Sequence, residues 1–501
     1  MPPAISFPAI PSNWPVPLFW MDFDNSQANS ATPPQRALLL GQTVTAEPMV
    51  PTYVTTPAMA AGLFGAGSML ARMVTAYRNV DPVGELWVIP LADAGGATAA
   101  TGSIAFTGPA TAAGTLALYI AGQVVNVAVT SGMTAAQLAT AVVAAITALT
   151  TVPVTAAIDG THNYQVDLTA RNKGLVGNSI DVRLNYYGPQ SGEILPAGIT
   201  AAVTAMSGGA TDPDLAAVEA LIANNTYDFI ALGGYTGSTQ LNEMQTIMAD
   251  RWAYNEAVYG HVWSAKMDAD ATGATNLTFG ATRNDPHMSV VSYEPSPSPP
   301  WEVAATWCGA SAVSLKADPA EPTWTLALPK LLPPAKGSSY ALSTVASLLQ
   351  AGLSVQSYQA GGVLILRNIT TYQKNAFGAA DNSYFDVQRL YQLMTIARTL
   401  KSVTTSKYGR VKLADNGTRI SAGSNMVTPD IVKGELITQY AQLVDDGIAD
   451  DIDAFTAGLI VQRNVADPTR LDVLFDPYLI NGLAILAVLN QFHAAAPPAN
   501  G

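Results

Sequence analysis

Charged residues are scarce in this chain, at 12% of its 501 residues, against about 25% in typical soluble domains. Small and apolar residues take their place, so much of the surface must carry no charge. A monomer with such a surface is prone to associate, which indicates that other subunits cover a large part of it. The alternative is an ordinary soluble protein rich in alanine and threonine.

Cysteine and histidine are also scarce, and their positions argue against common reactive and metal sites. The single cysteine, Cys308, cannot form an internal disulfide, which suits a reducing compartment, and no nearby charge in its apolar helix would activate it. The four histidines lack the spacing of a zinc site. We therefore expect no metal and no reactive thiol.

Motifs for enzymatic chemistry are missing as well. Neither a nucleophile elbow nor a phosphate-binding loop occurs. The run from Gly65 to Ser68 lacks the third glycine of a dinucleotide site and lies within a helical pattern that spans Pro57 to Tyr77, so we interpret its glycines as sites of close packing. We expect no catalytic residue and no cofactor.

Long apolar runs are absent too. The stretch from Leu479 to Leu489 is interrupted by Asn481 and Gly482 and is shorter than the roughly 20 residues that span a bilayer. The N-terminus lacks the basic region and the apolar run of a signal peptide. A net charge of −13 repels phosphate. We expect no membrane insertion, no secretion and no nucleic-acid binding.

The order of apolar patterns predicts a multidomain α/β and α+β fold. A buried strand at Ala37 to Gly41, a helix and a second strand at Glu85 to Leu91 start an α/β pattern that resumes after residue 208. Between linkers rich in glycine, alanine and threonine, a hairpin, one helix and further strands predict an inserted, outward-facing, β-rich α+β module at residues 94–208. The α/β middle domain then comprises residues 26–93 and 209–352.

The pattern of strands and helices in residues 353–477 predicts a further α+β domain. Strands are expected around Val355 and from Val363 to Arg367, followed by helices from Phe385 to Lys407 and from Pro429 to Leu443. A hairpin follows, turned at Asp467 and Pro468. Nine basic residues against three acidic ones lie between Arg367 and Arg419, and five aspartates lie between residues 445 and 453. These regions provide complementary patches for neighbouring copies, or else are solvated helix faces.

Two apolar segments remain at the chain ends, residues 1–25 and 478–501. The first is rich in proline, which disfavours a helix, and neither has the length or pattern to fold alone. We expect both to be arms that add strands to the sheets of other subunits, although they could also fold back onto their own subunit. The candidate arm residues are Ile5, Phe7, Ile10, Trp14, Leu479, Ile480, Leu483 and Ile485.

Seven stretches, in this order, resemble the sheath family of Mu-like contractile phages. They are Ile5 to Ser12, Leu39 to Gln42, Leu63 to Leu70, Glu85 to Leu91, Asn172 to Asn178, Ile369 to Tyr372 and Asp467 to Asp472. The extra prolines of the first stretch depart from the opening of that family, which leaves the strand register of the N-terminal arm open.

The resemblance implies a structural subunit of a contractile virion tail. Such a subunit polymerises helically around the tail tube and contracts to drive the tube through the host envelope. The implied partners are further copies, the tube protein, and the baseplate and tail terminator proteins, with assembly in the host cytoplasm. Residues 353–477 would form the inner domain, with Lys401, Lys407 and Arg410 as tube-facing candidates. A tube, capsid or adhesin subunit is the alternative.

Overall fold

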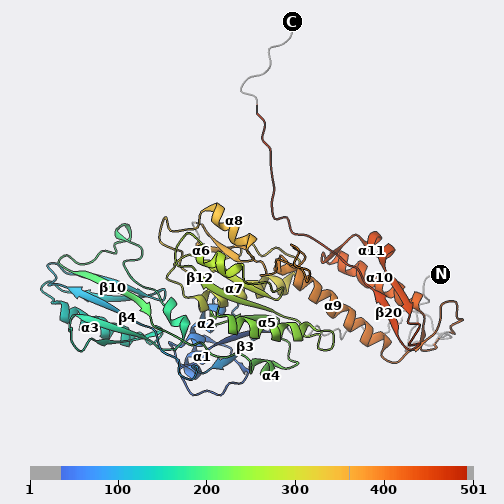
Figure 1. Cartoon of the computed structure of the whole chain (residues 1–501), viewed down its shortest axis with the longest axis horizontal. Coiled ribbons are helices and arrows are strands. Elements are labelled where there is room, and N and C mark those ends of the chain that lie inside the picture. Colours follow the sequence, from blue (N-terminus) through green and yellow to red (C-terminus); the bar gives the residue numbers. More distant parts are fainter. Residues whose placement is uncertain (1–34, 360–361, 422, 493–501) are drawn as a thin grey trace, which may run out of the picture.

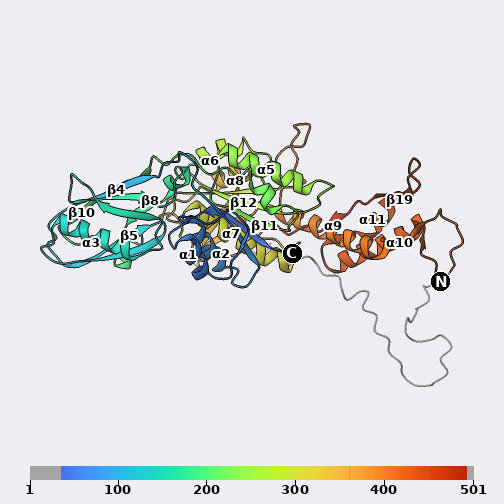
Figure 2. The ribbon, with the colours of Figure 1, turned by 90° about the horizontal axis from the view of Figure 1, so that it is seen from below.

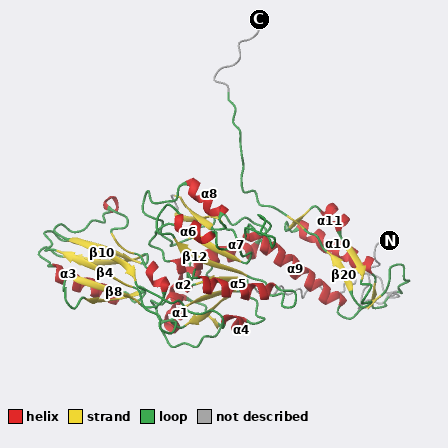
Figure 3. Ribbon diagram, in the orientation of Figure 1, coloured by secondary structure: helices red, strands yellow, loops and turns green. Residues whose placement is uncertain are grey.

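The computed structural model describes residues 35–359, 362–421 and 423–492. Three parts follow one another along the long axis of the molecule (Figure 1). A β-rich part lies at one end, an α/β part in the middle and a mainly helical part at the other end, as Figure 3 shows by element type. The N-terminal arm candidates Ile5, Phe7, Ile10 and Trp14 lie outside the described residues. The mixed α/β multidomain fold is confirmed.

The middle part is built on an eight-stranded sheet with the order β15-β14-β13-β12-β11-β1-β3-β2. The six inner strands are parallel, and the two edge strands, β2 and β15, run antiparallel to their neighbours. Helices cover the inner strands, and β1, β3 and β11 are accordingly almost continuous apolar runs. The strands are β1 (Ala37–Gln42), β2 (Thr52–Tyr53), β3 (Leu86–Leu91), β11 (Phe229–Leu232), β12 (His261–Met267), β13 (Met288–Tyr293), β14 (Ser354–Gln359) and β15 (Gly362–Arg367).

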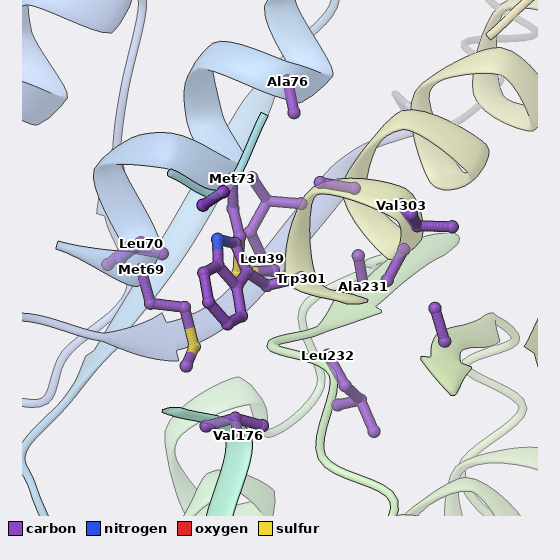
Figure 4. Close-up of a cluster of buried hydrophobic side chains, with 14 of the residues drawn as sticks. Leu39, Met69, Leu70, Met73, Ala76, Val176, Ala231, Leu232, Trp301 and Val303 are labelled. Carbon is purple, nitrogen blue, oxygen red and sulfur yellow. The ribbon is translucent and has the colours of Figure 1, made fainter. Parts of the chain in front are cut away.

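Seven helices of the described chain accompany this sheet, and α2 and α7 pack against each other over it. Figure 4 shows Trp301 of α7 beside Met69 and Met73 of α2, with Val176 facing the same cluster. The helices are α1 (Pro57–Phe64), α2 (Met69–Arg78), α4 (Val218–Ile222), α5 (Ser238–Trp252), α6 (Ala274–Gly280), α7 (Pro300–Ala317) and α8 (Leu342–Gln350).

The prediction of a single helix from Pro57 to Tyr77 is wrong, because the helical conformation is interrupted between α1 and α2. Gly65 has a φ of +86° and ends α1, and the Ser68 hydroxyl accepts a hydrogen bond from the Ala71 amide to cap α2. A Cβ atom on Gly67 would lie 2.5 Å from the Val152 carbonyl oxygen. This approach supports the interpretation of the glycines as sites of close packing.

The β-rich part contains two small antiparallel sheets and one helix. One sheet has the order β10-β4-β8-β7 and the other has the order β6-β5-β9. The elements are β4 (Thr101–Thr107), β5 (Gly114–Ile120), β6 (Gln123–Val129), α3 (Ala135–Ala148), β7 (Val154–Ile158), β8 (Gln165–Ala170), η1 (Leu175–Ser179), β9 (Val182–Leu184), η2 (Pro189–Ser191) and β10 (Thr200–Ser207). The chain enters and leaves side by side, since Thr98 and Ala210 exchange backbone hydrogen bonds.

The helical part follows the sheet, and its long helix α9 (Val387–Tyr408) leads away from it (Figure 1). Both predicted helices exist, as α9 and α10 (Pro429–Asp445), and so does the hairpin, as β19 (Ile460–Arg463) and β20 (Leu471–Leu474). Short pieces complete this part: β16 (Lys412–Leu413), β17 (Met426–Val427), β18 (Ala449–Asp450), α11 (Ile452–Gly458) and β21 (Tyr478–Leu479).

The expected division at residues 352 and 353 cuts through the eight-stranded sheet. Strand β14 pairs with β13, and β15 pairs with β14, so residues 354–367 complete the sheet of the middle part. The last strands of a sheet need their neighbours to satisfy backbone hydrogen bonds.

Among the described residues, no helix is long and apolar enough to cross a membrane.

Candidate assembly surfaces

The first half of α9 is anchored in the core beneath the central sheet. The Tyr391 ring stacks on Phe229 of β11 with ring centroids 4.9 Å apart, and its hydroxyl donates to the Asp228 carbonyl oxygen at 2.7 Å. Trp263 of β12 stacks beside Phe229 at 6.1 Å. Three aromatic rings therefore fix the direction in which α9 leaves the sheet.

An ion pair strengthens the same joint. The Arg398 guanidinium donates through Nη1 and Nη2 to the two carboxylate oxygens of Asp228, at 2.7 Å each. The Asp228 side chain is fully buried and that of Arg398 is 13% exposed. Burial raises the pKa of Asp228 above its ordinary value, and the neighbouring Arg398 opposes this rise. The carboxylate depends on its partner for compensation.

From Ile396 onward, α9 also contributes to a separate small core. Ile396 of α9 is buried together with Leu436 and Tyr440 of α10 and Phe455 of α11. The Tyr440 and Phe455 rings are stacked with centroids 3.7 Å apart. One continuous helix therefore joins the core of the sheet to the core of the helical part.

The three tube-facing candidates lie at or beyond the exposed end of this helix. Lys401 and Lys407 are on α9, Arg410 follows it, and all three side chains are exposed. The Lys407 ammonium forms an ion pair with Glu435 at 2.6 Å. Arg398, from the same basic stretch, is buried against Asp228 and is not part of this surface. Lys401 and Arg410 are thus the more accessible pair.

The C-terminal segment, from residue 478, is hydrogen-bonded to the helical part at its start and exposed after that. Strand β21 pairs antiparallel with β18, and the Gln392 amide donates to the Ile480 carbonyl oxygen at 2.9 Å. From residue 483 the chain extends away from the other parts (Figure 1). Its apolar side chains, at 72–84% exposure, are Leu483, Ile485, Leu486, Val488, Leu489 and Phe492.

The four candidate residues of this segment therefore differ in their surroundings. Leu479 is half-buried within β21, and Ile480 is 37% exposed. Leu483 and Ile485 are 72% and 77% exposed. The sequence pattern showed all four as one apolar run and could not reveal where the pinned part ends. Seen from below, the β-rich, α/β and helical parts again follow one another along the long axis (Figure 2).

Sequence reasoning missed the residues that hold the β-rich part on the middle part. Arg72 of α2 donates to the Thr151 and Ala121 carbonyl oxygens at 2.9 and 2.7 Å, and to the Glu302 carboxylate of α7 at 2.5 Å. The Asn172 side chain accepts from the Met69 amide at the start of α2. Arg72 is 5% exposed and Asn172 is 8% exposed. These buried polar contacts fix the β-rich part to α2.

Glu302 completes this junction at the edge of a hollow of about 340 Å³ lined also by Gly122, Gln123 and Leu331. Burial raises the pKa of Glu302, and the charge of Arg72 opposes that rise. No signal in the sequence could have paired these residues, because they lie 230 positions apart.

Groups suited to other chemistry are not brought together in the described ranges. No cluster of three or more histidine, cysteine, aspartate and glutamate side chains that could hold a metal ion occurs there. Cys308 is fully buried in α7, and this burial raises the pKa of its thiol. A buried neutral thiol behaves as a small apolar side chain.

Comparisons with known proteins place these surfaces in context. The model of the phage tail sheath C-terminal domain matches residues 379–493, which include α9, α10 and the C-terminal segment. The Mu-like prophage FluMu tail sheath protein of Haemophilus influenzae is 37% identical over 495 residues, which cover 98% of this chain and 99% of that protein. The C-terminal part is therefore a tail sheath domain. The chain as a whole belongs to the Mu-like phage tail sheath family.

Two solved structures are also similar to the chain. The sheath tail protein of Desulfitobacterium hafniense is 13% identical with a TM-score of 0.47, over 93% of this chain and 100% of that one. A chain of the anti-feeding prophage baseplate is 9% identical with a TM-score of 0.47, over 95% of this chain and 99% of that one.

Proposed function

We propose that this chain is the structural subunit of a contractile tail sheath, which polymerises helically around a tail tube and contracts to drive that tube through the host envelope. The observation that carries the proposal is the 37% identity to a tail sheath protein over nearly the full length of both chains. Contraction would be a change between two packings of subunits, so the stored free energy lies in interfaces and needs no catalytic residue.

The parts of the molecule suggest a division of roles. Residues 26–93 and 209–367 would form the middle domain, since the sheet extends to Arg367. Residues 368–477 would form the inner domain on the tube, and residues 94–208 an outward-facing module. The partners are further copies, the tube protein, and the baseplate and tail terminator proteins. The subunit would be assembled in the host cytoplasm and end in the virion tail.

The two terminal arms would link the subunits. The exposed apolar side chains from residue 483 onward support this role, because an extended segment gains backbone hydrogen bonds and burial when it adds to the sheet of another copy. The N-terminal arm would act in the same way. Lys401 and Arg410 would then face an acidic tube, with Lys407 shared with Glu435.

Negative-stain microscopy of the purified protein tests the proposal. A sheath subunit should form hollow tubular polymers, and coexpression with the tube protein should yield sheathed tubes of regular pitch. Closed shells would favour a capsid subunit, and a bare tube without a sheath would favour the tube. A monodisperse particle at every concentration and ionic strength would contradict the proposal.

A further inference from the structure

A short hairpin between β15 and α9 exposes a phenylalanine to solvent. Phe377 is 94% exposed. The Asn375 amide donates to the Ala379 carbonyl oxygen at 2.9 Å, and the Asn375 side chain accepts from the amides of Phe377 and Ala379 at 3.0 and 3.1 Å. Gly378 makes the turn with a φ of +79°. The phenylalanine is therefore presented by an ordered turn.

The base of this hairpin is tied to the body of the molecule. Asn284 accepts hydrogen bonds from the amides of Gln373 and Lys374 at 2.7 and 2.9 Å, and donates to the Lys374 carbonyl oxygen at 2.8 Å. The Tyr372 hydroxyl donates to the Asp381 carboxylate at 2.8 Å. A rigid, exposed aromatic side chain loses little conformational freedom on binding, which is typical of the anchor residues of interfaces.

A hollow with complementary properties lies between α4 and the C-terminal end of α5. Its volume is about 510 Å³, within the range of pockets that bury aromatic groups. Its wall combines small apolar side chains with three carboxylates, two amides and one guanidinium, and this Arg251 guanidinium donates to the Ala223 and Asn225 carbonyl oxygens at 2.7 and 2.8 Å. The lining residues are Ala216, Ala220, Ala223, Ala253, Glu219, Asp250, Glu256, Asn224, Asn255 and Arg251. Phe377 of the same chain does not fill it, because its side chain is almost fully exposed.

We propose that the Phe377 hairpin of one copy docks into the α4–α5 hollow of a second copy. The exposed Lys374 ammonium lies beside Phe377 in sequence and would meet the carboxylates of the hollow, whereas Asp381 is held back by Tyr372. Hairpin and hollow are different surfaces, so each copy offers one of each. Such a head-to-tail contact propagates into an open helical polymer. The inference rests on the proposed sheath function.

The chain permits a clean cross-linking test, because its one cysteine, Cys308, is fully buried. Polymers of the variant Ala379→Cys with Ala220→Cys are oxidised in the extended and contracted states, after microscopy has shown that they assemble. We expect a ladder of disulfide-linked oligomers that thiol reductant removes. Either single variant should give no disulfide-linked dimer.

Phe377→Ala provides the energetic test, with Leu342→Ala as the matched control, because Leu342 on α8 is 83% exposed. Loss of an aromatic anchor should raise the critical concentration for assembly by roughly tenfold or more, and the control should leave it unchanged. Both variants should keep the circular dichroism of the parent.

The outcomes separate the inference from the proposed function. Absence of a ladder from assembled double-variant polymers in both states overturns the docking contact, even if Phe377→Ala impairs assembly, since the hairpin then binds another surface or another protein. A disulfide-linked dimer from Ala379→Cys alone, which has one accessible thiol per chain, would show a hairpin-to-hairpin contact and overturn it as well. Failure of the parent protein to form any polymer would instead overturn the sheath function.

Discussion

Arg398→Ala should loosen the joint between α9 and the central sheet while both cores stay folded. The substitution removes two hydrogen bonds of 2.7 Å and leaves the fully buried Asp228 carboxylate without its partner. Breaking a buried ion pair from one side costs about 3–5 kcal/mol. Because each 1.4 kcal/mol is a factor of ten, local opening should become roughly a hundred to a few thousand times more frequent.

Hydrogen exchange measured by mass spectrometry locates this effect. Amides of the first half of α9, from Val387 to Ile396, should exchange faster in Arg398→Ala, and those of α10 should not. Lys401→Ala is the matched control, since Lys401 lies on the same helix and is exposed. The double variant Asp228→Asn with Arg398→Met should recover much of the protection, because no buried charge remains unpaired.

The pH dependence of the Arg398→Ala defect provides a second test of the Asp228–Arg398 ion pair. Without Arg398, burial is the largest influence on Asp228 and raises its pKa above the value in the unfolded chain, although Lys316 and Arg251 still act against it. An acid with a raised folded pKa stabilises the fold below its unfolded pKa and loses this contribution as pH rises through the folded pKa. The defect of Arg398→Ala should therefore shrink as pH falls from 7 towards 5. Exchange equal to that of the parent at pH 7, or a defect that grows on acidification, would refute the reasoning.

Three further changes test other contacts. Arg72→Ala should expose the linkers near Gly95 and Gly208 to limited proteolysis, because it frees two carbonyls of the β-rich part and leaves Glu302 unpaired; an unchanged cleavage pattern would contradict this role. Ending the chain after Gly482 should keep the circular dichroism and thermal unfolding of the parent but prevent long sheaths, and contractile full-length tubes from this variant would exclude an arm role. Lys401→Glu with Arg410→Glu should weaken tube docking most at low salt, where screening is slight, while Lys336→Glu, an exposed control outside α9, should not.

The sequence predicts the elements whose patterns are long or continuous. Strand β1 is buried at every position, so its apolar run is visible without its neighbours. Helices α9 and α10 have periodic apolar positions over 22 and 17 residues, and both were located to within a few residues. In such patterns the spacing of apolar residues within one segment shows which of its side chains are buried. A single stretch of sequence is therefore enough to predict the element.

Strands β4 and β10 could not be predicted, because their composition resembles a linker. Strand β10 has one buried side chain, Met206, among threonine, alanine and serine. Its strand conformation is set by pairing with β4, which lies about a hundred positions earlier. Helix α11 begins where Asp451 caps it, within the aspartate cluster at residues 445–453. Pairing between distant strands acts through contacts that no local window contains, whereas the Asp451 cap contacts Ala454 only three positions on.

Among the candidate surface residues, too, some can be predicted from the sequence and others cannot. Exposed charges such as Lys401 are evident from composition, but burial of Arg398 depends on Asp228, 170 positions away. Two residues of one basic stretch thus have opposite roles, one a surface charge and the other a clamp within the fold. Only the packing of α9 on the sheet distinguishes them.

The C-terminal segment shows why assembly has to enter the energetics of this chain. Full burial of each leucine, isoleucine or phenylalanine side chain contributes about 1.5–3 kcal/mol relative to exposure. The six exposed apolar side chains from Leu483 to Phe492 realise little of this in the single subunit, although β21 and Gln392 hold the segment in place up to Ile480. If the segment links copies as we propose, pinning before the apolar stretch would lower the entropy cost of its docking on a neighbouring copy. The free energy that the monomer does not gain would then hold copies together while their other contacts change.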